Sequence, residues 1–154
     1  MKQILKNKAF IVLFLILGLF IISLTWYLVS TSSSAVRVLF FPNNRTLGVS
    51  GEERRLYKNK DKESKYLQVL EELSLGPVEI DHGRILPKNI SINSLVFRGG
   101  SLYIDFSEDI LIFDADVRLS LMEILGIVSK TYFYNYPGIK TIYYSILGDR
   151  KSVV

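Results

Sequence analysis

The chain has 154 residues, with 19 Lys and Arg, 15 Asp and Glu, and no cysteine. A chain without cysteine forms no disulfide, thiolate metal site or thiol nucleophile, and carries no lipid on a cysteine. Three of the basic residues and none of the acidic ones precede a long apolar segment, so the rest of the chain has a net charge of only +1. The basic balance of the whole chain is therefore not a sign of nucleic-acid binding.

The apolar segment runs from Ala9 to Val29 and contains no charged residue. A helix of about 20 apolar residues crosses the roughly 30 Å hydrocarbon core of a bilayer. Lysines precede the segment, and no acidic residue comes before Glu52. Because positive flanks favour the cytoplasmic side, residues 1–8 are expected to form a cytoplasmic tail. The sequence predicts a single-pass protein of the bacterial cytoplasmic membrane, with the domain after Ser30 on the extracytoplasmic side.

A cleaved signal peptide is the alternative, since Ser33-Ser34-Ala35 offers small residues at a cleavage position. The apolar part of a signal peptide is usually about 7–15 residues long, and this segment is longer. A retained anchor is therefore favoured. The Ser-rich residues 30–34 are expected to form a short tether, followed by one extracytoplasmic domain over residues 35–154.

The domain is expected to begin with a strand over Ala35–Phe41, which is β-branched and aromatic and is stopped by Pro42-Asn43-Asn44. A short second strand is expected around Arg54–Tyr57. A helix follows over Lys60–Leu75, with Asp61 or Ser64 as its N-cap. Its apolar residues recur at helical spacing, at Tyr66, Leu67, Leu70 and Leu73.

Glycine and proline mark the ends of the next elements. Gly76-Pro77 is expected to end the helix, because glycine accepts a left-handed backbone and proline cannot continue the helix. Gly99-Gly100 predicts a tight turn between strands over Ile90–Phe97 and Ser101–Phe106. In the second of these strands apolar and polar residues alternate, which predicts one buried face.

A second helix is expected to start at Asp114 or Asp116 and to end before Pro137-Gly138. A last strand over Ile139–Leu147 is stopped by Gly148. The apolar stripe of this helix comprises Val117, Leu121, Ile124, Leu125 and Val128. Two amphipathic helices can bury their stripes on one face of a small sheet. The predicted fold is α+β: two helices on one face of a mixed sheet of three or four strands.

Read in order, these elements resemble the GerMN domain, a family named for a sporulation and germination protein. The resemblance spans nearly the whole domain: a first strand ending in an aromatic residue and Pro, a helix end that reads Leu-x-Leu-Gly-Pro, a Leu-Pro before a strand, an Asp-Phe-Ser strand end, and a Gly closing the last strand. These family landmarks are Pro42, Leu75, Gly76, Pro77, Leu86, Pro87, Asp105, Phe106, Ser107 and Gly148. The second helix has fewer small and Thr residues than is usual in the family, and some relatives carry two such domains where this chain has one.

The resemblance implies an extracytoplasmic module, membrane-anchored or tethered as a lipoprotein, and similar to folds that assemble side by side into rings. The family has no established catalytic residues, so the landmarks are expected to be structural. The resemblance implies no cofactor.

Two sets of residues could carry chemistry, and for both a structural role is favoured. His82, the only histidine, adjoins Asp81 but no nucleophile motif, so an exposed loop histidine is expected. A set of oxygen-bearing side chains could suit a hard cation, but its spacing is not that of a calcium loop, and helix capping explains part of it. This acidic set comprises Asp105, Ser107, Glu108, Asp109, Asp114 and Asp116.

Two further sets could form contact surfaces. A basic segment is interleaved with acids and is expected to be solvated surface, the alternative being contact with anionic head groups or wall polymers. The segment comprises Arg54, Arg55, Lys58, Lys60, Lys62 and Lys65. Core packing is favoured for the aromatic residues near the C-terminus, Phe133 included, with a partner or sugar-stacking patch as the alternative. The patch would comprise Tyr132, Tyr134, Tyr136, Tyr143 and Tyr144.

The function expected from the sequence is a non-catalytic, membrane-anchored module that acts by protein–protein assembly in the cell envelope. Its partner would be another copy of itself or another envelope protein. The competing hypothesis is a module that binds peptidoglycan or another wall ligand. An enzyme is disfavoured, since the sequence has no nucleophile motif, metal signature or phosphate-binding Gly loop.

Overall fold

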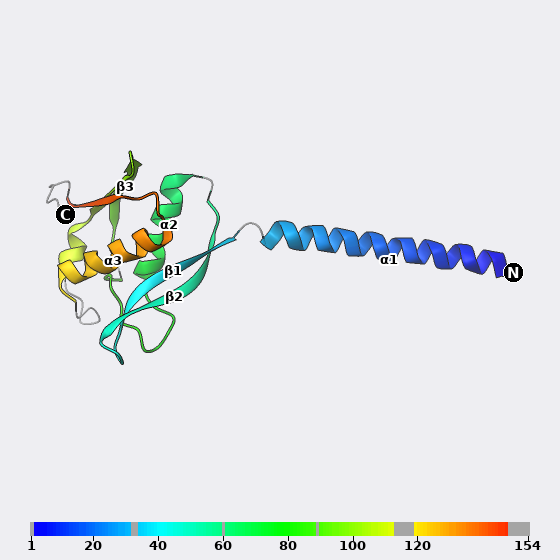
Figure 1. Cartoon of the computed structure of the whole chain (residues 1–154), viewed down its shortest axis with the longest axis horizontal. Helices are drawn as coiled ribbons and strands as arrows, with labels where there is room; N and C mark the ends of the chain where they lie inside the picture. Colours follow the sequence, from blue (N-terminus) through cyan, green and yellow to red (C-terminus); the bar gives the residue numbers. More distant parts are fainter. Residues whose placement is uncertain (1, 32–33, 60, 89, 113–118, 148–154) are drawn as a thin grey trace. The chain divides into compact units, whose positions relative to one another are not determined.

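The computed structural model describes residues 2–31, 34–59, 61–88, 90–112 and 119–147 (Figure 1). The chain divides into two compact units, Met1–Ala35 and Val36–Val154. The first unit contains helix α1, Lys2–Thr31. Within α1, Phe10–Val29 is 20 residues long and apolar enough to cross a membrane, and none of it is buried against the protein.

The second unit begins with two long strands, β1 (Ser34–Asn43) and β2 (Gly48–Tyr57), which pair in a two-stranded sheet. Strand β2 is longer than the predicted Arg54–Tyr57. Its inward face carries Glu52, Arg54 and Leu56 at alternate positions, so charged residues interrupt the apolar pattern that would mark a half-buried strand. The predicted first strand does not join the mixed sheet, because β1 and β2 form a sheet of their own.

Helix α2 runs over Lys62–Leu75, close to its predicted bounds. Of the two predicted caps, Asp61 is the one used, since its carboxylate accepts a hydrogen bond from the Ser64 amide at 2.7 Å. Gly76 ends the helix with φ +91°, a backbone conformation that favours glycine. Its buried face comprises Tyr66, Val69, Leu70 and Leu73.

A three-stranded mixed sheet forms the centre of the domain, in the order β3 (Ile92–Arg98), β4 (Ser101–Phe106) and β5 (Thr141–Ile146). Strands β3 and β4 are antiparallel, and β4 and β5 are parallel. The hairpin prediction is confirmed: Gly99 and Gly100 have φ values of +59° and +83°, as a tight two-residue turn requires. A short 3-10 helix, η1 (Glu108–Leu111), follows β4.

Helix α3, Leu121–Asn135, starts later than predicted. Ser120 is its N-cap and forms a capping box with Glu123, in which each side chain bonds to the backbone of the other. The predicted caps Asp114 and Asp116, with Val117, lie outside the described residues. The helix ends before Pro137-Gly138, as expected.

Both α2 and α3 cover the same face of the mixed sheet. On β4 and β5 the inward residues are buried, and Tyr144 donates a hydrogen bond to the Leu125 carbonyl of α3 at 3.3 Å. Helix α2 meets β3 through Tyr66 and Phe97, whose ring centroids are 5.2 Å apart. The hydroxyl of Tyr132 donates to the Tyr66 carbonyl at 2.7 Å and so joins the two helices. The predicted α+β arrangement is confirmed.

Side chains of α3 bond to the backbone of β1. Asn135 donates to the Val38 carbonyl at 2.6 Å and accepts from the Val38 amide at 3.0 Å. Thr131 accepts from the Phe40 amide at 3.2 Å. These polar side chains satisfy backbone groups that a neighbouring strand would otherwise pair with.

Candidate functional site

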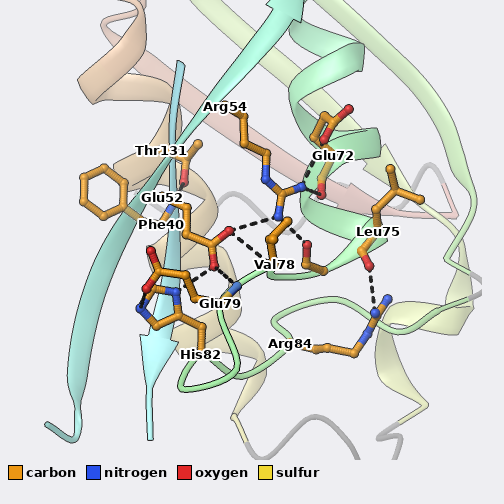
Figure 2. Close-up of polar contacts among 11 residues, drawn as sticks. Phe40, Glu52, Arg54, Glu72, Leu75, Val78, Glu79, His82, Arg84 and Thr131 are labelled. Atoms are coloured by element: carbon orange, nitrogen blue, oxygen red, sulfur yellow. Dashed lines mark hydrogen bonds and ion pairs between the residues drawn. The ribbon is translucent and has the colours of Figure 1, made fainter. Parts of the chain in front are cut away.

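The most concentrated set of buried charges lies around Glu52 of β2, which is 5% exposed (Figure 2). Its carboxylate accepts hydrogen bonds from His82 Nδ1 at 2.7 Å and from Arg54 Nη2 at 3.1 Å. It also accepts from the backbone amides of Val78 and Glu79, both at 3.1 Å. A single carboxylate thus joins strand β2 to the loop after α2.

The environment of Glu52 favours its ionised form. Burial alone raises the pKa of this carboxyl, but the hydrogen bonds from Val78, His82, Glu79 and Arg54 together outweigh it and hold the pKa below its usual range. Because a carboxylate only accepts, the imidazole donates from Nδ1. Glu52 and His82 therefore form a fixed polar contact in the domain interior.

Two arginines close the C-terminus of α2. Arg54 donates to the Gly76 carbonyl at 2.6 Å and to the carbonyl and carboxylate of Glu72 at 3.3 and 3.0 Å. Arg84 donates to the Leu75 carbonyl at 2.8 Å (Figure 2). The last carbonyls of a helix lack intrahelical partners and carry partial negative charge, so guanidinium groups are well matched to them.

The geometry of His82 does not provide nucleophilic catalysis. Its side chain is only 2% exposed, Nδ1 is bonded to Glu52, and Nε2 lies 3.6 Å from a Glu79 carboxylate oxygen. Neither imidazole nitrogen faces a hydroxyl or amine that it could activate. The expectation of an exposed loop histidine is wrong, because Glu52, 30 positions earlier, holds the ring inside.

Within the described part of the chain, no group of three or more His, Asp or Glu side chains is placed to hold a metal ion. In the acidic set, Asp105 accepts from Ser145 at 2.6 Å and from Asn93 at 3.1 Å. Ser107 donates to Asp109 at 2.8 Å. Asp114 and Asp116 lie outside the described residues, so this set is described only in part.

Most of the family landmarks lie at turns and element ends. The Pro42 carbonyl accepts from the Gly83 amide at 2.8 Å. Leu86, Pro87 and Phe106 are buried. Leu75 and Pro77 flank Gly76 at the end of α2 and are not buried, whereas Asp105 and Ser107 make the bonds given above. Gly148 lies outside the described residues.

Gly76→Ala is expected to destabilise the domain by about 1–3 kcal/mol, because alanine strains this backbone conformation. An added Cβ would also lie 2.5 Å from Arg84 Nη1 and displace the arginine that caps α2. Urea unfolding followed by circular dichroism measures the change. Gly126→Ala is the control: Gly126 lies exposed within α3 with nothing within 4 Å of its added Cβ, so stability should rise by about 0.5–1 kcal/mol. Equal effects at the two sites would contradict the assigned role of Gly76.

The five tyrosines of the predicted patch do not share a surface. Tyr132, Tyr136 and Tyr144 are buried, whereas Tyr134 and Tyr143 are 64% and 37% exposed on α3 and β5. For the three buried rings the core interpretation holds. Phe133, like Tyr134, is exposed.

An exposed aromatic pair lies instead on the face of the mixed sheet opposite the helices. Tyr103 and Tyr143 stack with centroids 5.0 Å apart and an interplanar angle of 12°. Val96 pairs with Tyr103 across β3 and β4 and is 44% exposed. We call Val96, Tyr103 and Tyr143 the open sheet face. Sequence reasoning missed Tyr103 and Val96, although the alternation of Tyr103 with buried Leu102 and Ile104 marks an outward residue.

The basic segment divides between interior and surface. Arg54 points inward and is ion-paired with Glu52 and Glu72, so the surface interpretation is wrong for this residue. Arg55, Lys58 and Lys62 are exposed, and Lys65 is half-buried. Lys60 lies outside the described residues.

Hollows on the described part of the domain surface include a larger and a smaller one. The larger, about 800 Å³, is lined by the hairpin of β1 and β2, by Gly83 and Arg84, and by Leu119, Glu123 and Ile127. The smaller, about 360 Å³, is mostly apolar and is lined by residues that include Phe106, Ile110, Leu125 and Tyr144. Neither is lined by the stacked pair of Tyr103 and Tyr143.

The fold and these contacts define a small α+β module with two helices on one face of a mixed sheet. The family model Germane, described as sporulation and spore germination, matches residues 38–151. The chain belongs to this family, and the resemblance predicted from the sequence is confirmed. Among curated proteins no match is found.

Solved structures of GerMN domains share the fold. The first GerMN domain of the sporulation protein GerM from Bacillus subtilis is 21% identical, with a TM-score of 0.60 over 75% of this chain and 85% of that one. The tandem GerMN domains of the same protein give 20% identity and a TM-score of 0.61, covering 77% of this chain. This chain spans only 41% of that tandem structure.

Proposed function

We propose that the chain is a non-catalytic module, anchored in the cytoplasmic membrane by α1, which acts by protein–protein assembly on the extracytoplasmic side. The observation that carries the proposal is the apolar segment Phe10–Val29. A helix of 20 such residues is long and apolar enough to cross the hydrocarbon core of a bilayer. The three lysines before it favour the orientation with the N-terminus inside.

The mixed sheet supplies the surface for assembly. Among the described residues, β3 and β5 each pair with β4 alone, so each has one edge without a strand partner. Unpaired strand edges accept further strands, and exposed tyrosines suit protein interfaces. The open sheet face lies on the same sheet and is continuous with both edges. In the two-stranded sheet, by contrast, side chains of α3 already bond to the backbone of β1. We therefore assign the contact with a protein partner to the mixed sheet.

The membrane part is tested with the full chain expressed in a bacterium. We expect it to remain in the membrane fraction after alkaline extraction and its domain to be digested by protease added outside. Ile16→Arg with Phe20→Asp, two charges in the middle of the segment, should release it, since each costs about 2.5–3.5 kcal/mol at the centre of a helix. Ile16→Leu with Phe20→Leu is the apolar control. Release of the wild-type chain by alkali, or a protected domain, would overturn this part.

The assembly part is tested by site-specific photo-cross-linking of the anchored chain. A photoreactive residue in place of Tyr143 is expected to give a cross-linked protein, with twice the chain mass if the partner is a second copy. The same residue in place of Met122, which is exposed on α3, is the control. Absence of any protein neighbour at Tyr143, Tyr103 and Val96 would end the proposal of an interface on this face.

A wall ligand is the second candidate, and the hollow of about 800 Å³ favours it. Polar groups of Asn43, Asn44, Arg84 and Glu123 line this hollow and could bond to a glycan or peptide. The exposed tyrosine pair lies elsewhere, on the open sheet face, which favours the first candidate. Binding of the domain to purified peptidoglycan, lost in Asn44→Ala, would support a wall ligand, and no binding would exclude it.

A further inference from the structure

Three cationic side chains surround a group of aromatic rings in the domain. Arg37 Cζ of β1 lies 4.8 Å from the centroid of Tyr136, and Lys65 Nζ of α2 lies 5.3 Å from the same ring. Lys62 Nζ, also of α2, lies 5.8 Å from the centroid of Phe97. We call Arg37, Lys62 and Lys65 the cationic cluster.

The rings beneath the cluster are continuous. Tyr66 contacts Tyr136 with centroids 4.8 Å apart and Phe97 with centroids 5.2 Å apart. Lys65 Nζ lies 4.8 Å above Tyr66 as well. Because Tyr66 and Tyr136 are buried and Phe97 is half-buried, the rings fix the stems of the cations without giving them a counter-charge.

No acid in the described residues forms an ion pair with any of the three cations. The pKa of Lys65 is lowered by burial and then by the positive charges of Arg37 and Lys62. The two acids nearest to Lys65 in sequence do not pair with it. The Asp61 carboxylate accepts hydrogen bonds from Ser64. Glu63 projects from α2 about 160° around the helix axis from Lys65. Three like charges are thus held together without an ion pair to any described acid, an arrangement that favours an anionic ligand.

The cluster is close in the chain to the apolar helix. Only residues 32 and 33 separate the end of α1 from the start of β1, and Arg37 is the fourth residue of β1. From Val29 to Arg37 the chain advances eight residues, which span at most about 29 Å when fully extended. Arg37 therefore cannot lie farther than this from the end of the apolar segment.

We propose that the cationic cluster binds the phosphate groups of anionic lipids on the membrane surface from which α1 emerges. The inference rests on the proposed function, because it requires α1 to span the membrane. A guanidinium group can bond to a phosphate through two N–H groups, and the two ammonium groups add charge. Anionic lipids attract basic residues that lie within about a Debye length of the surface. The contact would hold the domain against the bilayer by a defined face.

The test uses the full chain in vesicles of phosphatidylcholine alone or mixed with phosphatidylglycerol. Lysine acetylation, mapped by mass spectrometry, is expected to slow about fivefold at Lys62 and Lys65 when phosphatidylglycerol is present, and to recover at high salt. Lys130, whose Nζ lies 4.4 Å over the Phe40 ring, is the internal reference and should not change. Equal acetylation of Lys62 and Lys65 in both kinds of vesicle would overturn the inference.

Matched variants separate the cluster from overall charge. In the wild-type chain, phosphatidylglycerol is expected to protect the backbone amides of α2 from hydrogen exchange. The triple variant Arg37→Gln with Lys62→Gln and Lys65→Gln should abolish this lipid-dependent protection. Arg45→Gln with Lys88→Gln and Lys130→Gln removes the same charge elsewhere and should retain it. Retained protection in the first variant would also overturn the inference. The acetylation result on the unmodified chain decides the question if that variant is poorly folded.

Three further outcomes distinguish the ways in which the inference can fail. Release of the chain from both kinds of vesicle by alkali would reject the membrane anchor, and the lipid contact with it. A chain that resists alkali but shows no lipid-dependent protection would reject only the lipid contact. If soluble poly(glycerol phosphate) protects Lys62 and Lys65 in phosphatidylcholine vesicles as well as phosphatidylglycerol does, the ligand is a wall polymer and the lipid assignment is wrong.

Discussion

Glu52→Gln is expected to lower the free energy of unfolding of the domain by about 3–5 kcal/mol, the range for breaking a buried charge pair by removing one partner. The carboxylate accepts from His82, from Arg54 and from two backbone amides, and the neutral amide cannot satisfy all of these donors. Arg54, whose side chain is only 12% exposed, would be left with Glu72 alone to balance its charge. The loss should appear in urea unfolding of residues 34–154 at neutral pH.

The effect of Glu52→Gln should depend on pH. The pKa of Glu52 is lower in the folded domain than the ordinary value of 4.5, so its contribution to stability is complete above that value and is lost as the pH falls through the folded pKa. The difference between wild type and variant should therefore shrink in acid. Glu53→Gln on the outward side of β2 is the control and should change stability by less than about 0.5 kcal/mol. A difference that stays constant down to strongly acidic pH would contradict this account.

Tyr132→Ala is expected to destabilise the domain by about 3–5 kcal/mol, because the ring is wholly buried between α2 and α3. Tyr132→Phe keeps the ring but leaves the Tyr66 carbonyl without its hydroxyl donor, at a cost of about 1–3 kcal/mol. Thermal unfolding followed by circular dichroism measures both changes. Tyr134→Phe, on an exposed ring of the same helix, is the control and should be nearly neutral.

The free energy of unfolding at alkaline pH gives an independent test of the buried position of Tyr132. Burial raises its pKa well above the ordinary value of 10.0, so ionisation favours the unfolded chain. The contribution of Tyr132 to the free energy of unfolding should be complete below pH 10.0 and should be lost as the pH rises through the folded pKa. The free energy of unfolding of the Tyr132→Phe variant should therefore decrease less steeply with pH than that of the wild type. If Tyr132→Phe changed partner cross-linking but not stability, the ring would belong to a contact surface and the core assignment would be wrong.

Local signals in the sequence predicted much of the fold. Gly99-Gly100, Gly76 and Asp61 each act through the backbone next to them, so the hairpin, the end of α2 and its start follow from short windows of sequence. The start of α3 could have been found in the same way. Ser120 and Glu123 have the spacing of a capping box, a signal that the prediction of a cap at Asp114 or Asp116 missed.

The interior charges could not be predicted in this way. Glu52, Arg54 and Leu56 share one face of β2, and the alternation of a half-buried strand is hidden when two of its inward residues are charged. His82 is buried by a residue 30 positions away, and no local pattern records such a pairing. The same holds for the tyrosines near the C-terminus, whose division between core and surface depends on how α3 and β5 pack.

The bonds between β1 and α3 also set an order for folding during synthesis of the chain. Val38 and Asn135 are 97 positions apart, and Phe40 and Thr131 are 91 apart, so these contacts of β1 can form only when nearly all of the chain is available. At about 5–20 residues per second, synthesis of that interval takes roughly 5–20 s. Throughout that time the part of the core that α3 contributes is missing around Leu39, Phe40 and Phe41. A chain synthesised from its N-terminus thus presents the apolar strand β1 before α3 is available to pack on it, and apolar segments exposed in this way are prone to aggregate.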